Sequence, residues 1–277
     1  MCRWLAYSGS PILLDELLYK PRHSLIDQSL HARLGVETTN GDGFGVGWYA
    51  VDGGPPVLFR GTGPAWSDPN LRELASTVSS PLFLAHIRAS TGTPVQQTNC
   101  HPFRHGRWLW MHNGAIRDFS RVKRDLVLAV NPELYPNIAG STDSEVMFHL
   151  ALTFGLQDDP VAAVERMVGF VESVGQQHGV QHPVQMTVAM TDGERMWVFR
   201  YSSEHESRSL YFSTAVSTLR AMYPDNENLR RVSDETRIVV SEPLVELVGA
   251  WQPVPESSYG VIQKGADRLG TFRPSLP

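Results

Sequence analysis

The chain has 277 residues, of which 42% are hydrophobic and 19% charged, and its formal net charge is −5. A chain of this length buries a sizeable core, and we expect one domain over residues 1–277. The acidic balance argues against a nucleic-acid partner, and two cysteines cannot form a disulfide framework. Apolar stretches such as 150–154 are too short to span a bilayer, and no signal peptide is evident, so the sequence predicts a cytoplasmic protein with no membrane partner.

The elements alternate between strands and helices along the chain. Early strands are predicted at 2–7, 44–51, 57–60 and 81–87, and late strands at 209–213, 237–240 and 259–263. Helical patterns are predicted at 70–77, 117–130, 142–155 and 160–178. Two hairpins are predicted, with turns at His105-Gly106 and Asp192-Gly193. The segment from about 251 is expected to wrap around the domain with one last strand.

This order favours an α+β domain over a doubly wound parallel fold. Strands come first, helices occupy the middle, and strands return at the end. Hairpins connect many of the strands, which is typical of antiparallel sheets, whereas parallel sheets require crossover helices. We therefore expect a layered α+β architecture with antiparallel sheets.

Cys2 combines two reactive groups if the initiator methionine is removed. Its thiol and a free α-amino group would then share one carbon. An α-amine has a pKa near about 8 and can accept a proton, while a thiol of pKa near about 8.5 becomes a good nucleophile once it is deprotonated. This arrangement is typical of N-terminal nucleophile hydrolases. A cysteine at position 2 also occurs by chance in many proteins.

Asn113 and Gly114 follow a predicted strand, and an Asn-Gly pair there first of all indicates a turn. The functional alternative is an oxyanion hole, which needs a side-chain amide donor and a nearby backbone N–H. Glycine would let the substrate approach the backbone closely. Taken alone, the turn is the stronger interpretation.

Two charged residues could bind the ends of a zwitterion. Arg88 ends a predicted strand before Ser90-Thr91-Gly92, where a guanidinium could grip a carboxylate, although a surface salt bridge explains it equally well. Asp143 lies in the first turn of a predicted helix, where Thr142 and Glu145 form a capping-box pattern. Capping explains this pattern without a ligand, and it is compatible with Asp143 binding an ammonium group.

The remaining sequence patterns give weaker indications of a catalytic or binding role. The glycine-rich segment 40–48 leads into a strand rather than into a helix, so it predicts close backbone packing beside an active site or a glycine-rich turn, and not a dinucleotide site. Cys100 is expected to be a buried apolar cysteine. We expect no metal and no cofactor, because the spacing of the central histidines matches no metal-binding pattern. Those histidines are His86, His101, His105 and His112.

The order of these segments is more specific than any one of them. The series comprises Met1-Cys2-Arg3, 40–45, 88–92, 99–103, His112-Asn113-Gly114 and 142–145. It resembles the class II glutamine amidotransferases, which are N-terminal nucleophile hydrolases, and among them the stand-alone YafJ-like branch related to the ergothioneine-pathway γ-glutamyl amidohydrolase. The resemblance covers essentially the whole chain, including 241–244 near its end.

The resemblance implies a four-layer αββα sandwich with two facing antiparallel sheets. It also implies roles for individual residues: the nucleophile, with its α-amine as base, is Cys2, and the oxyanion hole is Asn113 with Gly114. The substrate α-carboxylate would bind Arg88 with Thr91 beside it, the α-ammonium would bind Asp143, and His101 would organise the site. The thiolate would attack the γ-carboxamide of glutamine, and water would then hydrolyse the γ-glutamyl thioester to glutamate.

The chain departs from the family pattern at one residue and in its domain content. Many relatives have an aromatic residue after the arginine, whereas Ala89 follows Arg88 here, which puts strict glutamine specificity in doubt. No ammonia-consuming domain is evident, so the ammonia goes either to a separate partner subunit or to solvent. Three hypotheses remain open: a glutamine amidotransferase, a hydrolase of a modified γ-glutamyl amide, and a non-catalytic scaffold or ligand-binding module. The sequence also leaves a homo-oligomer open.

Overall fold

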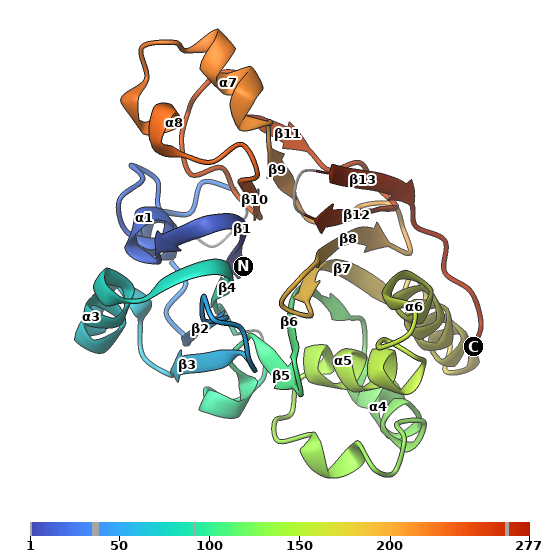
Figure 1. Ribbon diagram of the computed structural model, residues 1–277. Coiled ribbons are helices and arrows are strands. Elements are labelled where there is room, and N and C mark those ends of the chain that lie inside the picture. Colours follow the sequence, from blue (N-terminus) through green and yellow to red (C-terminus); the bar gives the residue numbers. More distant parts are fainter. Residues whose placement is uncertain (1, 35–38, 91, 264–265) are drawn as a thin grey trace.

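The computed structural model describes residues 2–34, 39–90, 92–263 and 266–277. In these ranges, two antiparallel β-sheets lie at the centre of the molecule (Figure 1). The strands of the first sheet are β1 (Arg3–Leu13), β2 (Phe44–Trp48), β3 (Val57–Gly61), β4 (Ser79–Ile87), β9 (Tyr211–Ser213), β10 (Arg237–Val240) and β11 (Trp251–Pro253). Those of the second are β5 (Phe103–His105), β6 (Trp108–Ile116), β7 (Val184–Thr191), β8 (Met196–Ser202), β12 (Ser258–Gln263) and β13 (Ala266–Thr271). Within the described ranges, the strand orders are β11-β9-β10-β1-β4-β2-β3 and β13-β12-β8-β7-β6-β5.

Helices cover the outer face of each sheet. The first sheet is covered by α1 (Asp15–Leu18), α2 (Leu25–His31) and α3 (Pro69–Thr77). The second is covered by α4 (Phe119–Leu128), α5 (Asp143–Thr153) and α6 (Pro160–Gln177). The short helices α7 (Val216–Met222) and α8 (Glu227–Arg231) lie together at one end of the first sheet, in orange in Figure 1. Short 3₁₀ turns occur at Ala65–Ser67, Gln97–Asn99 and Tyr135–Asn137.

Three apolar cores hold these layers together. Between the sheets, Trp4 and Leu84 of the first sheet pack in one cluster with Leu109 and Met111 of the second. Separate clusters join the first sheet to α1–α3 and the second sheet to α4–α6. Successive residues of β1 therefore alternate between two buried faces, with Leu5 and Tyr7 in the helix-side core. The predicted α+β fold with an αββα order of layers is confirmed.

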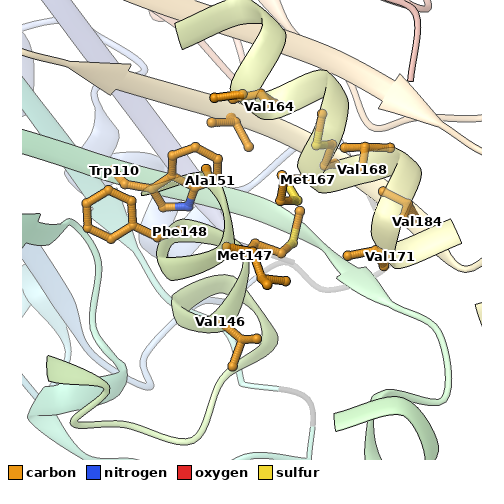
Figure 2. Packing of buried hydrophobic residues seen from close by; sticks show 14 of the residues in the cluster. Trp110, Val146, Met147, Phe148, Ala151, Val164, Met167, Val168, Val171 and Val184 are labelled. Atoms are coloured by element: carbon orange, nitrogen blue, oxygen red, sulfur yellow. The ribbon is translucent and has the colours of Figure 1, made fainter. Parts of the chain in front are cut away.

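Helix α5 is buried on nearly every side, because it lies between β6 and α6 (Figure 2). Its side chains Met147, Phe148 and Ala151 are each fully buried, and the ring of Phe148 stacks on Trp110 of β6 at 5.6 Å. Helix α6 begins at Pro160, where Asp159 caps the Ala162 N–H. The tight packing of α5 on β6 fixes where the N-terminal end of α5 meets the second sheet.

The larger predicted elements are confirmed, and the differences concern turns and short elements. The first strand runs on to Leu13, and the turn after β5 is at Gly106-Arg107, one residue later than predicted. The loop between β7 and β8 has four residues rather than two, because Thr191 pairs with Met196. The sequence did not indicate α1, α2, α7, α8, β11 or β13, which are short or lack a clear period.

The C-terminal segment contributes to both sheets. From Trp251 onward it forms β11 in the first sheet and then β12 and β13 in the second, so the expectation of one last strand was wrong. The chain then runs along α6, where Glu165 accepts hydrogen bonds from Arg273 N and Ser275 N. A single domain over residues 1–277 stays our proposal. Within the described ranges, no helix has both the length and the apolar character needed to cross a bilayer.

Candidate active site

Cys2 lies just before β1 and is half-buried. Its Sγ atom lies 3.3 Å from the N atom and 3.4 Å from the O atom of Ala89, the second residue after β4. Burial raises the pKa of the Cys2 thiol, while the hydrogen bond from Ala89 and the charges of Arg88 and Arg208 act in the opposite direction. The thiol therefore holds its proton at rest, and a nucleophilic role requires a base that removes it.

Two donors bind the backbone carbonyl of Cys2. Asn113 donates from Nδ2 at 2.9 Å, and Arg3 donates from a terminal guanidinium nitrogen at 3.1 Å. The Oδ1 atom of Asn113 lies 3.0 Å from Nε2 of His86. Since Asn113 is on β6 and His86 on β4, these contacts join the two sheets beside the thiol.

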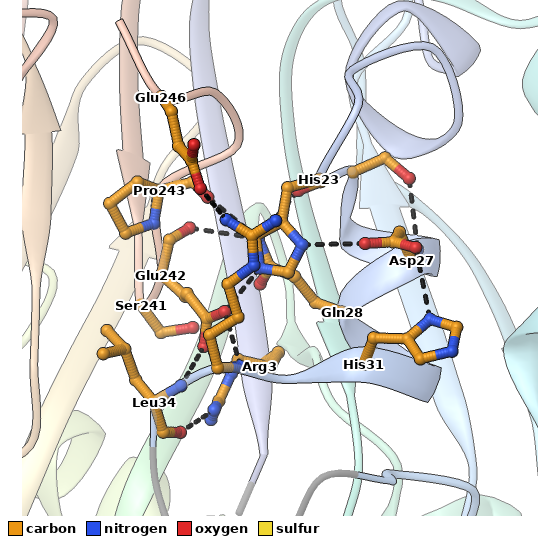
Figure 3. Close-up of polar contacts among 12 residues, drawn as sticks. Arg3, His23, Asp27, Gln28, His31, Leu34, Ser241, Glu242, Pro243 and Glu246 are labelled. Atoms are coloured by element: carbon orange, nitrogen blue, oxygen red, sulfur yellow. Dashed lines mark hydrogen bonds and ion pairs between the residues drawn. The ribbon is translucent and has the colours of Figure 1, made fainter. Parts of the chain in front are cut away.

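The guanidinium of Arg3 is part of a buried polar network (Figure 3). Glu242 accepts from Arg3 Nε at 2.8 Å, from Arg33 N at 2.9 Å and from Leu34 N at 3.0 Å. His23 Nε2 contacts the same carboxylate, and Gln28 donates to the Glu242 backbone carbonyl at 3.2 Å. Burial alone would raise the pKa of Glu242, but the hydrogen bonds from His23 and the two backbone N–H groups and the charge of Arg3 hold it below its usual range.

Asn113 and Gly114 lie inside β6, where they pair with Thr187 and Met186 of β7. The interpretation of this pair as a turn is therefore wrong. Gly114 has a φ of +144°, and a Cβ atom there would lie 1.8 Å from the backbone oxygen of Gln185. Only glycine fits this close approach of β6 to β7. The pairing of β6 with β7 continues in register through Gly114, the residue next to Asn113.

Arg88 follows β4 directly and is 3% exposed. Its guanidinium donates to the Asp42 backbone oxygen at 3.2 Å, to Ser90 Oγ at 3.1 Å and to Thr93 Oγ1 at 2.6 Å. All three acceptors are neutral oxygens, so the alternative of a surface salt bridge is wrong. A buried cation that is held by neutral acceptors attracts an anion strongly. Thr91, the predicted neighbour of the carboxylate clamp, lies outside the described residues, as does Met1.

Asp143 is the first residue of α5, and its carboxylate points at the end of β6. Oδ2 accepts from Ile116 N at 2.8 Å, and Oδ1 accepts from Ser144 N at 2.7 Å. Ile116 is three residues beyond Asn113, which at about 3.3 Å per strand residue is about 10 Å. The predicted cap is present, since Thr142 Oγ1 accepts from Glu145 N at 3.2 Å. The Glu145 carboxylate instead binds Ala139 N and Gly140 N, at 2.9 and 2.7 Å.

Three of the central histidines, namely His86, His101 and His112, are buried, whereas His105 at the end of β5 is half-buried. The ring of His101 lies 4.3 Å from that of His86 and 4.6 Å from that of Phe103. Burial lowers the pKa of His86 to about 3 and that of His101 well below its usual range. His112 donates to or accepts from Ser144 Oγ through Nδ1 at 2.8 Å, which links β6 to the start of α5. These rings are neutral at physiological pH, and they pack behind the Cys2–Asn113 pair.

The glycine-rich segment allows the first sheet to approach these rings. A Cβ atom on Gly45 would lie 2.1 Å from the His101 backbone oxygen, and one on Gly43 would lie 2.6 Å from Cys100 Sγ. Close backbone packing, as predicted, therefore explains this segment. Cys100 is fully buried, as predicted.

The structure brings several of the predicted site residues together. Asn113 contacts Cys2 directly, and Arg88 is the chain neighbour of Ala89, which contacts the Cys2 thiol. Asp143, at the start of α5, binds the N–H of Ile116 at the end of β6, the strand that contains Gly114, whereas the ring of His101 contacts that of His86. Sequence reasoning did not assign roles to Arg3, His86 or Glu242, although two of them lie inside the quoted family segments 1–3 and 241–244.

The sequence and the fold of the chain are similar to those of known proteins. Residues 21–275 match the family model of class II glutamine amidotransferases. The chain is 35% identical to the probable glutamine amidotransferase DUG3 of Saccharomyces cerevisiae, over 95% of this chain and 82% of that protein. It is 34% identical to a gamma-glutamyl-hercynylcysteine sulfoxide hydrolase of Mycobacterium tuberculosis, over 42% of this chain and 50% of that protein. A solved glutamine aminotransferase class-II domain protein from Silicibacter pomeroyi superposes with a TM-score of 0.75 at 32% identity, covering 99% of this chain and 100% of that one.

We expect Glu242→Gln to destabilise the fold by about 3–5 kcal/mol near neutral pH, because it removes a buried carboxylate charge that pairs with the Arg3 guanidinium. A carboxyl whose folded pKa is lowered stabilises the fold above its unfolded pKa of about 4.3 and loses that contribution as pH falls through the folded value. The difference between parent and variant should therefore shrink in acid. Denaturant titrations at a series of pH values measure it, with Glu246→Gln, whose side chain is 82% exposed, as the control expected to change little. A difference that stays constant with pH would contradict the assignment.

Proposed function

Because the chain belongs to the class II glutamine amidotransferases, we propose that it hydrolyses the γ-amide of glutamine through a thioester on Cys2, releasing glutamate and ammonia. The match to this family and the similarity to a γ-glutamyl hydrolase indicate that the chain is an enzyme. The observation that carries the proposal is the arrangement around Cys2. The amide of Asn113 donates to the carbonyl of the half-buried Cys2, and the Cys2 thiol contacts Ala89. Ala89 directly follows Arg88, a buried arginine held by neutral acceptors.

The proposed nucleophilic step begins with loss of the thiol proton. The α-amino group of Cys2, free once Met1 is removed, has an ordinary pKa of about 7.7–8.0 and accepts that proton. The thiolate then attacks the γ-carbon of the carboxamide and forms a tetrahedral intermediate. Collapse of the intermediate breaks the C–N bond, the ammonium on Cys2 returns the proton to the departing nitrogen, and the thioester remains. Water, deprotonated by the same amine, hydrolyses that thioester to glutamate.

The oxyanion of the intermediate is assigned to Asn113 and Gly114. A side-chain amide carries two N–H groups, and one of those of Asn113 is bound to the Cys2 carbonyl. The second is assigned to the oxyanion, and the backbone N–H of Gly114, the next residue of β6, is assigned as the other donor. Preorganised donors of this kind each contribute about 10²–10³ in kcat.

The ends of the glutamyl group are assigned to the two charged residues. The guanidinium of Arg88, with Thr91 beside it, would bind the α-carboxylate, and the carboxylate of Asp143 would bind the α-ammonium. An ionised carboxyl offers about four lone-pair sites, and Asp143 retains one beyond the donors at Ile116 and Ser144. His101 is proposed to organise the site through its contact with His86.

A second candidate function is hydrolysis of a modified γ-glutamyl amide. It is favoured by the match to gamma-glutamyl-hercynylcysteine sulfoxide hydrolase and by Ala89, which replaces an aromatic residue beside the clamp with a methyl group. The deciding experiment measures glutamate release from glutamine and from a panel of γ-glutamyl amides. A kcat/KM for glutamine that matches or exceeds every other value supports the amidotransferase, with ammonia passed to a partner subunit or released. A preference for a larger leaving group supports the hydrolase.

We expect Cys2→Ala and Cys2→Ser to lose most glutamate release while the melting temperature stays close to that of the parent. The side chain supplies the covalent step and fills little of the core. An electrophilic glutamine analogue should label Cys2 and leave Cys100, which is fully buried, unlabelled in the folded protein. Peptide mass mapping locates the label, and a label on Cys100 alone would contradict the mechanism.

We expect the active protein to begin at Cys2. The α-amine can act as a base only when it is free, because a peptide bond to Met1 removes its basic lone pair. Intact-mass analysis of a preparation with measured activity tests this. Full activity in protein that retains Met1 would refute the assignment of the base.

We expect Arg88→Ala and Asp143→Ala each to lower kcat/KM by at least about tenfold, since each removes a charge-assisted hydrogen bond worth about 1.5–3 kcal/mol. The thermal stability should fall more for Asp143→Ala, because its carboxylate also holds Ile116 N. Arg124→Ala, at an arginine that is 83% exposed, is the matched control. A decarboxylated substrate should be as poor for Arg88→Ala as the intact one. If the variant still discriminates like the parent, Arg88 is not the carboxylate partner.

A further inference from the structure

The side-chain amide of Asn113 is bound at both ends. Nδ2 lies 2.9 Å from the Cys2 carbonyl oxygen, and Oδ1 lies 3.0 Å from Nε2 of His86. All of this is buried, since His86 is 1% exposed and Asn113 3% exposed. His86 is on β4, where it pairs with Trp4 of β1 and with Gly45 of β2, so the contact with Asn113 crosses from the first sheet to the second.

The chemistry of the partners fixes the orientation of this amide. A backbone carbonyl only accepts hydrogen bonds, so the Asn113 atom that faces Cys2 must be the NH₂ group. The atom that faces His86 is then the carbonyl oxygen, and Nε2 of His86 must donate to it. Rotating the amide by half a turn would set oxygen against oxygen at Cys2 and N–H against N–H at His86. Both contacts would become repulsive.

His86 itself is held in one state. Its ring lies against that of His101 at 4.3 Å, and burial keeps it neutral. In the described part of the chain, its Nδ1 atom has no partner at hydrogen-bond geometry, although the His112 backbone lies near enough to the ring to raise its pKa slightly against the effect of burial. A bare lone pair there costs less than an unpaired N–H, which agrees with the proton on Nε2.

We propose that His86 is a positioning residue for the hydrolysis, which holds the Asn113 amide so that its second N–H is aimed at the oxyanion. This inference rests on the proposed function at Cys2, because an aimed donor matters only if an oxyanion forms there. His86 touches neither the thiol nor the bound substrate in this role. It acts through Asn113, and its effect should appear in the transition state rather than in substrate binding.

The first test compares three substitutions. In His86→Gln the side-chain NH₂ reaches about the place of Nε2, whereas in His86→Asn it reaches only about the place of Nδ1, and His86→Leu has no donor. We expect His86→Gln to keep kcat within a few-fold of the parent. The other two should lower kcat by about 10- to 100-fold, short of the full loss of an oxyanion donor, with KM changed little. Equal kcat values for the three variants would overturn the proposal.

The second test is a double-mutant cycle with Asn113→Ala. If His86 acts through Asn113, His86→Leu should lower kcat by less than about twofold in the Asn113→Ala background. Additive losses would show that His86 acts independently and would overturn the proposal. His149→Leu controls for the loss of a buried neutral histidine, since His149 is 3% exposed on α5 and bonds to the Glu145 backbone. It should lower stability with kcat unchanged.

A third readout does not depend on activity. Long-range ¹H–¹⁵N spectra of the His86 ring should show the neutral Nε2–H tautomer from about pH 5 to pH 8, and its signal should shift in Asn113→Ala. Failure of the proposed function would appear as a parent protein that hydrolyses no γ-glutamyl substrate. Failure of this inference would appear as an active parent with the opposite tautomer, or with His86→Leu at full kcat.

Discussion

The carbonyl of Cys2 is the point at which both sheets, the nucleophile and a buried charge network meet. Asn113 donates to it from the second sheet and Arg3 donates to it from the first. A residue at the start of a strand would ordinarily fray, since few contacts hold a terminus. Here two donors bind the backbone of that residue, and the Arg3 donor is itself held by Glu242 from the C-terminal half of the chain. The position of the thiol is thus set by residues from both ends of the sequence.

Two buried arginines near the Cys2 carbonyl, Arg3 and Arg88, differ in the charge of their hydrogen-bond acceptors. The charge of Arg3 is compensated by Glu242, so that cation has a structural role and little remaining attraction for an anion. Arg88 is equally buried, but its acceptors are neutral oxygens of Asp42, Ser90 and Thr93. Two arginines with the same burial therefore serve different purposes. The neutral rings of His86 and His101 add no charge near Asn113, so they do not compete with Arg88 for an anionic ligand.

The sequence predicts the layers of this fold better than its local bends. Long periodic segments such as 160–178 and the apolar strand at 81–87 gave elements close to those observed, because burial determines both pattern and structure. The Asn113-Gly114 pair misled local reasoning. A turn signal depends on the pair alone, whereas here the pairing with the neighbouring strand β7 keeps both residues in the sheet, with Gly114 at a φ of +144°. Contacts such as Arg3 with Glu242, 239 residues apart, cannot be read from spacing at all.

The residues assigned to recognition all address the glutamyl part of a substrate. Arg88 and Asp143 would read its α-carboxylate and α-ammonium, and Asn113 with Gly114 would bind the oxygen of the scissile amide. That part is identical in glutamine and in any γ-glutamyl amide. These residues therefore favour γ-glutamyl amides as a substrate class, but they do not discriminate between glutamine and its relatives. The choice must come from groups that meet the departing nitrogen, and we propose Ala89 as one of them, since its backbone contacts the Cys2 thiol and its side chain is only a methyl group. If these assignments hold, recognition of the glutamyl group is fixed, whereas discrimination between leaving groups can be changed by single substitutions such as one at Ala89.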